Sequence, residues 1–484
     1  MAVALQKPRH SRETVFVPHQ RPVVVVGLLI LSDLLTLAIT GLAAYWARRQ
    51  FGPLETDLYL RFLPSLLLFP LGGLYAGLYP GYALSPAEQL RSTFRAITWV
   101  TLILVAASFL LKVGDKLSRP VILGWWLLSV FVLPLSRSLV RAALIRTSLW
   151  GHPVVVLGAA KTGEAVVRRL LSNPGLGLRP VACYDDDSTK HGQSCGGAPV
   201  VGTLRQAATV AQSGKVSYVI IAMPGLSRER LTYVVEQYAA VFSHVIIIPD
   251  LLGLTSLWVS ARDIQGVLGL ELQQNLLSAW NHLLKRTLDL VIAIPALFMV
   301  GPLILILGWL VKLNSPGPGF YAQDREGLNG DRIRVWKLRT MVPDAETKLN
   351  AYLDANPNAR CEWDKHMKLK DDPRIVPRVG HLLRRYSLDE LPQIWNIIKG
   401  EMSLVGPRPF PYYHLDRFSP AFRALRRKVL PGLTGLWQVS ARSEGDLGIQ
   451  QELDTYYIRN WSLWLDIYLL GRTVTAVLCG EGAY

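Results

Sequence analysis

The stretch SLDELPQIWNIIKGEMSLVGPRP, residues 387–409, places two adjacent carboxylates, Asp389 and Glu390, just before a run with helical hydrophobic periodicity. Ser387 and Glu390 have the spacing of a capping box, in which both side chains satisfy free N–H groups of a first helical turn. One interpretation is therefore structural. The other is chemical, because an ionised aspartate beside a divalent metal can attack a phosphoryl group. The arginine in the closing Gly-Pro-Arg-Pro turn is suited to holding phosphate through paired donors.

The composition indicates a membrane protein that meets anionic groups. The 484 residues include 52 basic and 36 acidic ones, which gives a net charge of +16, and half of the residues are hydrophobic. A nucleic-acid binder can be as basic but is rarely as apolar, so the pattern favours lipid headgroups or phosphorylated substrates over nucleic acid. The cysteines show no C-x-x-C spacing, which excludes a zinc ribbon and fits a reducing compartment.

Four apolar segments predict a four-helix transmembrane domain over residues 23–146, after an N-terminal segment of residues 1–22. The segments cover residues 23–46, 58–79, 94–111 and 120–135. Basic residues are concentrated before the first segment, between the second and third, and after the fourth. The positive-inside rule therefore puts the N-terminus and everything after Arg137 in the cytoplasm. Asp33 lies inside the first segment, and we expect it to make a polar contact within the bundle.

The pattern over residues 147–270 alternates strands and helices and predicts a doubly wound, Rossmann-like α/β domain. The expected strands begin at Pro153 and cover residues 181–184, 216–222 and 244–248. The glycine turn at residues 158–163 departs from the dinucleotide fingerprint, because Ala160 replaces the second glycine. Asp185 comes where a ribose-binding acid could lie. A nucleotide site and a degenerate regulatory domain therefore both remain open.

A fifth apolar stretch, residues 290–313, forms most of a predicted linker and membrane helix over residues 271–313. It is long enough to cross a bilayer, which would place residues 314–484 outside the cell. Pro295 and Pro302 favour another outcome, since proline removes a backbone donor and kinks a helix. A kinked apolar helix can enter one leaflet and return to the face that it left. These residues alone leave both outcomes open.

The motifs that follow resemble those of the bacterial sugar transferase family, the monotopic phosphoglycosyl transferases. In chain order they are Lys285-Arg286-x-x-Asp289, the helix-breaking Pro295, Ser-Pro-Gly-Pro, Lys-x-Arg-Thr-Met and Val-Gly-Pro-Arg-Pro. The whole chain is similar to the large members, which add four spans and a Rossmann-like domain. Among these it looks most like undecaprenyl-phosphate galactose phosphotransferases.

The resemblance implies a two-step transfer in a catalytic domain over residues 314–484. Asp389 would attack a UDP-sugar, release UMP and hold the sugar phosphate covalently until undecaprenyl phosphate accepts it. Asp389 and Glu390 would bind Mg²⁺. A substrate-binding role is implied for Lys285, Arg286, Arg339, Arg408, Gln438 and Arg442.

The resemblance also implies a location and partners. The protein would be a multi-pass protein of the bacterial cytoplasmic membrane, with its catalytic domain on the cytoplasmic face and a re-entrant helix broken near Pro295. UDP-galactose is the favoured donor, UDP-glucose is the alternative, and the product would begin O-antigen, capsule or exopolysaccharide synthesis. A membrane-anchored nucleotide-sugar dehydratase is disfavoured, since the sequence lacks a Tyr-x-x-x-Lys pair. A non-catalytic scaffold of polysaccharide assembly is a further alternative, and a homodimer is one open oligomeric state.

Overall fold

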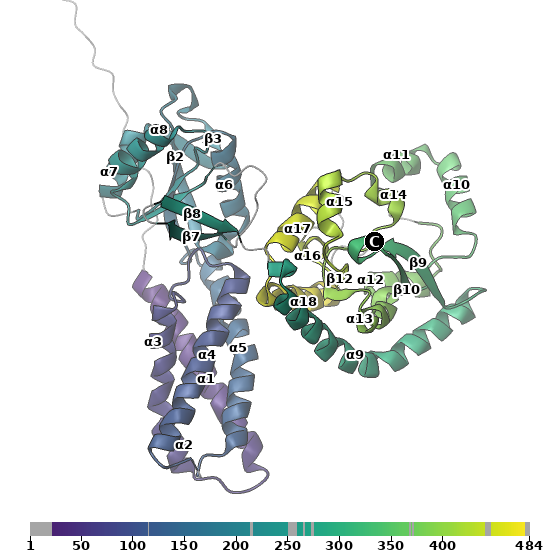
Figure 1. Cartoon of the computed structure of the whole chain (residues 1–484), viewed down its shortest axis with the longest axis horizontal. Coiled ribbons are helices and arrows are strands. Elements are labelled where there is room, and N and C mark those ends of the chain that lie inside the picture. The colour runs from purple at the N-terminus through teal and green to yellow at the C-terminus, as the bar shows by residue number, and fades with distance from the viewer. Residues whose placement is uncertain are drawn as a thin grey trace, which may run out of the picture. The chain divides into compact units, whose positions relative to one another are not determined.

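The computed structural model describes residues 22–114, 116–212, 216–249, 259–264, 267–272, 275–366, 369, 372–440 and 447–479. The chain forms two compact units, Met1–Leu252 and Gly253–Tyr484, whose elements are labelled in Figure 1. The unit boundary falls before residue 270, where the sequence predicted the α/β domain to end. Apart from its last residue, the predicted N-terminal segment, residues 1–22, lies outside the described residues.

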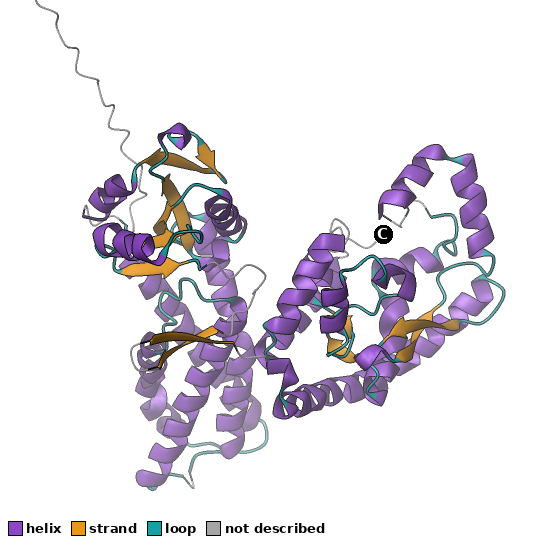
Figure 2. Cartoon of the chain, turned by 45° about the horizontal axis from the view of Figure 1, so that its top comes forward, coloured by secondary structure: helices purple, strands orange, loops and turns teal. Residues whose placement is uncertain are grey.

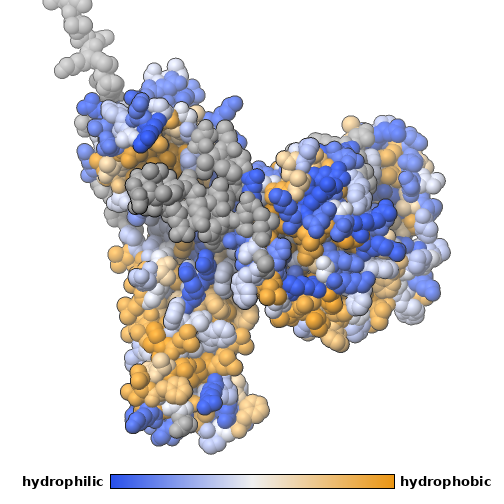
Figure 3. Space-filling view, viewed as in Figure 1, coloured by the Kyte–Doolittle hydropathy of each residue, from blue (hydrophilic) through white to orange (hydrophobic). Residues whose placement is uncertain are grey.

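Long apolar helices make up the first half of the first unit. They are α1 (Pro22–Arg49), α2 (Thr56–Phe62) with η1 (Leu63–Leu67) and α3 (Leu68–Tyr75), α4 (Pro86–Leu110) and α5 (Arg119–Arg146). Each of the four stretches is long and apolar enough to cross a membrane. Large hydrophobic side chains such as Leu31, Trp99 and Phe131 are exposed on them, and Figure 3 shows the apolar band that results. Such a surface fits lipid rather than water.

Asp33 is completely buried in this bundle. Its carboxylate accepts hydrogen bonds from Arg137 of α5, at 3.0 Å from Nε and 2.7 Å from Nη2, and from the Tyr79 hydroxyl. Pairing of this kind offsets part of the desolvation cost of a charge in an apolar environment. The prediction of a bundle-facing polar contact is confirmed.

The second half of the first unit is an α/β domain. Its sheet has the order β3 (Ser194–Cys195), β4 (Ala198–Gly202), β2 (Leu178–Tyr184), β1 (His152–Leu157), β5 (Tyr218–Ile221) and β6 (His244–Ile247). The strands pair in parallel except β3 with β4. Helices α6 (Lys161–Ser172), α7 (Leu204–Gln212) and α8 (Arg228–Val234), the last continued by η4 (Val235–Ala239), connect them. The apolar cores on the two sheet faces are separate, so the doubly wound prediction is confirmed.

The glycine turn of this domain is held by close contacts among its own residues and by a hydrogen bond to Asp185. Gly158 has a φ of +98°, and a Cβ atom on Gly163 would approach the Gly158 carbonyl oxygen to 1.9 Å. Both positions therefore require glycine. The Asp185 carboxylate accepts from the Ala159 N–H at 2.8 Å and pairs with Lys190 at 3.0 Å. The acid is thus bonded to the turn itself, and nucleotide binding stays a prediction.

The second unit is mainly helical, with small two-stranded sheets (Figure 2). Its elements before the carboxylate pair are β7 (Val259–Ile264), β8 (Val267–Leu272), η5 (Asn275–Leu277), α9 (Ala279–Asn314), β9 (Phe320–Glu326), η6 (Leu328–Gly330), β10 (Arg332–Leu338), α10 (Ala345–Ala355), α11 (Pro357–His366) and α12 (Val379–Arg385). From that pair onward they are η7 (Leu388–Gln393), α13 (Ile394–Lys399), β11 (Ser403–Val405), α14 (Tyr412–Leu415), α15 (Pro420–Arg426), β12 (Gly432–Thr434), α16 (Leu436–Ser440), α17 (Leu447–Arg459) and α18 (Leu463–Cys479).

Helix α9 carries the fifth apolar stretch, and it continues through Pro295 and Pro302. The predicted break near Pro295 is therefore wrong. Figures 1 and 2 both show the helix bent rather than interrupted. A bend is enough to relieve the clash of a proline ring with the preceding turn, because each proline removes only one hydrogen bond.

Both ends of α9 pack against the same unit. Near its start, the buried Asp289 accepts from the Leu404 N–H at 3.0 Å. Near its end, Leu307 and Val311 join Leu338 and Leu383 in one apolar core. The middle of the helix instead exposes large apolar side chains, among them Val291, Ile294, Phe298, Met299, Leu303, Leu305 and Ile306.

Candidate active site

The two carboxylates of the opening stretch lie on a tight 3₁₀ turn, η7, and not on a capped α-helix. Ser387, which precedes the turn, has a left-handed backbone with φ of +53°. Its side chain makes no capping hydrogen bond to the described residues of the turn. The capping-box interpretation is therefore wrong. Pro392 lies inside the turn, and a proline there interrupts the α-helical hydrogen bonding that a capping box would start.

Glu390 is held by two cations from different parts of the chain. Lys337 Nζ of β10 lies 2.7 Å from its carboxylate, and Arg408 Nη2 lies 3.1 Å from it. The Lys337 and Glu390 side chains are 13% and 16% exposed, so solvent screens this pair less than a surface pair. The structure thus brings Arg408 to the carboxylate pair, and its predicted substrate-binding role stays a prediction.

Lys337 was not among the predicted site residues, although a signal for it exists. Strand alternation puts it on the same face of β10 as Ile333 and Val335, which are both buried. A lysine on a buried face needs an anionic partner, because an unpaired charge there is costly. That partner is Glu390.

Asp389 lines a cavity of about 500 Å³ together with Glu390, Lys337 and Arg408. Burial raises the pKa of Asp389, the positive charge of Lys337 opposes that shift, and Glu390 adds to it. Other polar and aromatic residues around the cavity include Thr340, Asp372, Arg374, Arg384, Tyr386, Trp437 and Gln438. A cavity with several cations and a carboxylate can take a phosphorylated ligand and offer it a nucleophile.

The donor set of the cavity is compatible with Mg²⁺. No cluster of three or more His, Cys, Asp or Glu residues suited to a metal occurs in the described part of the chain. Mg²⁺ commonly uses only one or two carboxylates and completes its shell with water and substrate phosphates. Asp389 and Glu390 line the cavity side by side, although Glu390 already pairs with Lys337 and Arg408, as Asp372 does with Arg374 at 2.6 Å. Mg²⁺ binding by Asp389 and Glu390 stays a prediction.

Three of the predicted substrate-binding residues make contacts within the protein, and the described lining of the cavity does not include them. Lys285 pairs with Asp466 at 2.7 Å and donates to the Val405 carbonyl at 2.9 Å. Arg286 donates to the carbonyls of Ile397 and Ile398 at the end of α13. Arg339 is buried and donates to the Pro316 and Ser315 carbonyls at 2.5 and 2.7 Å. A substrate role for these three stays a prediction.

The last two predicted residues are Gln438 and Arg442, and the structure describes only the first of them. Gln438 lines the cavity, and its side-chain amide donates to the Leu433 carbonyl at 3.3 Å. Arg442 lies outside the described residues. Gln438 is thus close enough to the carboxylate pair for the predicted role in the nucleotide-sugar site.

A buried ion pair supports the turn that carries Arg408. Arg426 Nη2 donates to the Arg408 carbonyl, and its Nη1 lies 3.7 Å from the Asp454 carboxylate. Burial raises the pKa of Asp454 to about 7, although Arg426 opposes the shift. No sequence motif indicated Arg426 or Asp454, because these two residues and Arg408 come from three separate parts of the chain.

Comparison with known proteins finds two matching family models and several relatives aligned over most of their length. Residues 280–480 match the model described as bacterial sugar transferase, and residues 75–249 match a CoA-binding domain. The chain is 34% identical over 398 residues to the UDP-galactose-lipid carrier transferase of Erwinia amylovora, and 32% identical over 400 residues to the undecaprenyl-phosphate galactose phosphotransferase of Salmonella typhimurium. Both alignments cover 82% of each protein. It is 31% identical to the UDP-glucose:undecaprenyl-phosphate glucose-1-phosphate transferase of Escherichia coli, over 88% of this chain and 90% of that protein.

Proposed function

The chain belongs to the bacterial sugar transferase family, and from this premise we propose that it moves a hexose 1-phosphate from a UDP-sugar to undecaprenyl phosphate. The products are undecaprenyl-diphosphate-sugar and UMP, and the reaction starts the assembly of a surface polysaccharide. Galactose is the proposed hexose, because the two relatives of 34% and 32% identity are named for galactose and the one of 31% for glucose. The observation that carries the proposal is the cavity that Asp389 shares with Glu390, Lys337 and Arg408.

The reaction has two displacements at one phosphorus atom. A carboxylate oxygen of Asp389 attacks the β-phosphorus, and the bond to the bridging oxygen of the α-phosphate breaks, so UMP leaves with both electrons of that bond. A phosphate oxygen of undecaprenyl phosphate then attacks the same phosphorus and releases Asp389. Splitting the transfer in this way lets one cavity handle the two substrates in turn.

The charges around Asp389 support its role as the attacking group. Only the ionised carboxylate is a nucleophile, and burial opposes ionisation while Lys337 favours it. Arg408 and Lys337 fix Glu390 beside it. Mg²⁺ held by Asp389 and Glu390 would neutralise charge on the diphosphate when it is bound. The basic residues of the cavity would stabilise the charge that grows on the departing UMP.

We also propose that α9 is re-entrant and that the catalytic unit lies on the cytoplasmic face of the bacterial inner membrane. A straight helix of this length would measure about 54 Å, well beyond the roughly 30 Å of a hydrocarbon core. A crossing helix would hold its ends on opposite sides of the membrane. In α9 the segment around Asp289 and that around Val311 both contact one unit, which supports entry and return on one face. UDP-sugars are cytoplasmic, so a catalytic unit on the cytoplasmic face can reach them. The positive-inside rule puts the chain after Arg137 on that same face.

The test is release of UMP by the purified protein in nanodiscs, supplied with Mg²⁺, undecaprenyl phosphate and a panel of UDP-sugars. Release with UDP-galactose supports the whole proposal, and release with UDP-glucose instead keeps the reaction and changes the sugar. Failure with every UDP-sugar, from protein that unfolds cooperatively, would favour the scaffold interpretation.

A further inference from the structure

A second cavity of about 860 Å³ lies in the membrane bundle between α4 and α5. Its lining on α4 follows one helical face, from Thr98 through Leu102 and Val105 to Phe109. On α5 it follows the face of Arg119, Ile122, Leu123 and Trp126. Two facing helical stripes therefore form a groove along the bundle.

The interior of this groove is suited to a hydrocarbon chain. The hydroxyls of Thr101 and Ser108 donate to carbonyls of their own helix at 2.8 and 2.7 Å, so they present little polarity to the groove. Trp126 and Thr98 are the lining residues farthest from the basic end, and the Trp126 indole N–H donates to the Thr98 hydroxyl at 3.1 Å. From Thr98 to Phe109 the groove runs about 16 Å along α4, which is half of a roughly 30 Å hydrocarbon core. Its length is thus that of one leaflet.

The open end of the groove is basic. Lys112 and Arg119 line it there, at the end of the bundle where α4 stops and α5 starts. The connection over residues 112–119 contains three basic residues and one acidic residue, a net charge of +2, although its Asp115 lies outside the described residues. Its third cation, Lys116, pairs with Glu55 at 3.4 Å, whereas the ion pairs of the described residues include neither Lys112 nor Arg119.

We propose that this groove is a binding site for an anionic phospholipid of the leaflet at that end of the bundle. The phosphate lies between Lys112 and Arg119, and an acyl chain runs along Leu102 and Val105 towards Trp126. Charge complementarity selects the headgroup, and the length of the groove matches a chain of one leaflet. An undecaprenyl chain exceeds that length, which favours a bilayer phospholipid over the polyprenyl substrate.

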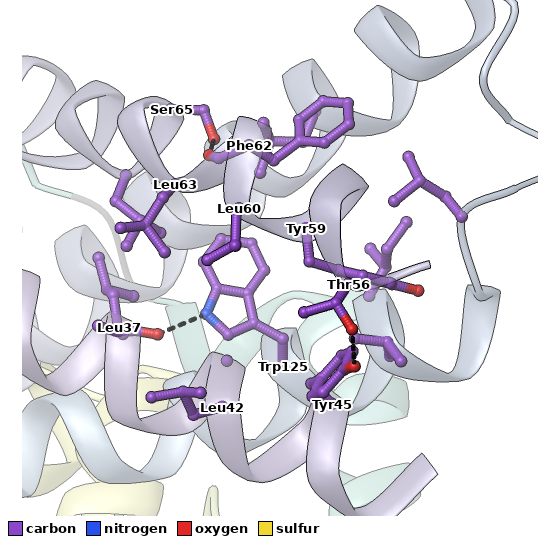
Figure 4. Close-up of a pocket in the computed structure, with 17 residues that line it drawn as sticks. Leu37, Leu42, Tyr45, Thr56, Tyr59, Leu60, Phe62, Leu63, Ser65 and Trp125 are labelled. Carbon is purple, nitrogen blue, oxygen red and sulfur yellow. Dashed lines mark hydrogen bonds between the residues drawn. The ribbon is translucent and has the colours of Figure 1, made fainter. Parts of the chain in front are cut away.

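A neighbouring cavity provides an internal comparison. It has about 190 Å³ and is lined by residues of α1, α2, η1, α4 and α5, including Leu37, Tyr45 and Trp125 (Figure 4). Trp125 donates to the Leu37 carbonyl at 3.0 Å, and Tyr45 bonds Thr56 at 2.7 Å. None of its described lining residues is charged, so it has no means to select a phosphate.

The experiment is native mass spectrometry of the full-length protein released from nanodiscs that contain equal amounts of phosphatidylglycerol and phosphatidylcholine. We expect the wild type to retain phosphatidylglycerol, and the double change Lys112→Gln and Arg119→Gln to reduce that retention on the order of tenfold. Val105→Trp leaves the basic end intact and fills the groove, so it should cause a similar loss. Arg48→Gln with Arg49→Gln is the matched control, because these residues end α1 at the same end of the bundle and lie outside the described groove lining.

Several results would overturn the proposal. An equal loss in the control pair would show attraction by surface charge without a site. Equal retention of phosphatidylcholine by the wild type would show a chain slot that does not recognise phosphate. When undecaprenyl phosphate is added, its preferred retention in a manner that depends on Lys112 and Arg119 would assign the groove to the polyprenyl lipid instead. None of these readouts uses catalytic activity, so the outcome is independent of the proposed reaction.

Discussion

Arg426 Nη2 donates a hydrogen bond of 2.6 Å to the backbone carbonyl of Arg408. This bond joins α15 to the turn that carries Arg408, whose side chain lies 3.1 Å from Glu390. The Arg426 guanidinium also lies 4.7 Å from the Phe410 ring centroid, so it contacts this turn at two residues. The position of Arg408 in the site therefore depends on a residue that lies outside the described cavity lining.

Replacing Asp389 by Asn should abolish turnover and leave the fold intact. The amide is nearly the same size but is a poor nucleophile, so neither UMP release nor a sugar-phosphate adduct should form. The measurement is incubation with a UDP-sugar labelled in the sugar, followed by mass spectrometry of the denatured protein. Asp344→Asn makes the same chemical change at a side chain that is 60% exposed and pairs only with Lys348 at the start of α10, among the ion pairs of the described residues, so it serves as the control. Substantial turnover by Asp389→Asn would remove this residue as the nucleophile.

Lys337→Gln should shift the acid limb of the pH–rate profile to higher pH. The positive charge of Lys337 lowers the pKa of Asp389 against the effect of burial, so its loss raises that pKa further. A smaller fraction of Asp389 is then ionised at a given pH, and kcat/KM should fall by roughly tenfold or more at neutral pH. The profile of Lys348→Gln, a surface lysine 47% exposed, should match that of the wild type. An unmoved acid limb in Lys337→Gln would contradict this account of the charges.

Asp454→Asn should flatten the pH dependence of stability between pH 5.5 and 8. Burial raises the pKa of Asp454 in the folded protein from 3.8 to about 7. A raised folded pKa means that proton uptake stabilises the fold at low pH, and this contribution is lost as the pH rises through about 7. A difference of about three pKa units corresponds to about 4 kcal/mol over the whole interval between the two pKa values, of which about 2 kcal/mol falls between pH 5.5 and about 7. Thermal unfolding over this range measures it, and a slope equal to that of the wild type in Asp454→Asn would show that Asp454 does not titrate there.

Cysteines at the two ends of α9 should be labelled from the same side of the membrane. Leu283→Cys and Lys312→Cys place thiols at exposed positions near its start and its end, in a background where Cys361 and Cys479 are serine. A membrane-impermeant maleimide applied to vesicles of known orientation reports the side of each. Phe51 is 85% exposed and follows the end of α1 that the positive-inside rule puts outside the cytoplasm. Phe51→Cys should therefore be labelled from the opposite side. Labelling of residues 283 and 312 from opposite sides would show that α9 crosses the bilayer.

The sequence predicts the periodic parts of this fold better than the site. Apolar runs and strand alternation mark the membrane helices, β1 and the glycine turn, because burial imposes those patterns locally. The sequence did not predict the short strands β3 and β4, since two to five residues are too few to show a period. Family motifs marked Asp389, Glu390 and Arg408. They did not separate Lys337, which lines the cavity, from Arg339, which lies two positions later and fixes a loop.

The bend of α9 has a mechanical consequence. Its exposed apolar surface, from Val291 to Ile306, needs a hydrocarbon environment, yet both ends return to one protein surface. If α9 is re-entrant as proposed, it adds cross-sectional area to one monolayer and none to the other, as a wedge does. The bound protein should then favour bilayers whose near monolayer is loosely packed, and it should itself bend a flat sheet of lipid towards its own side.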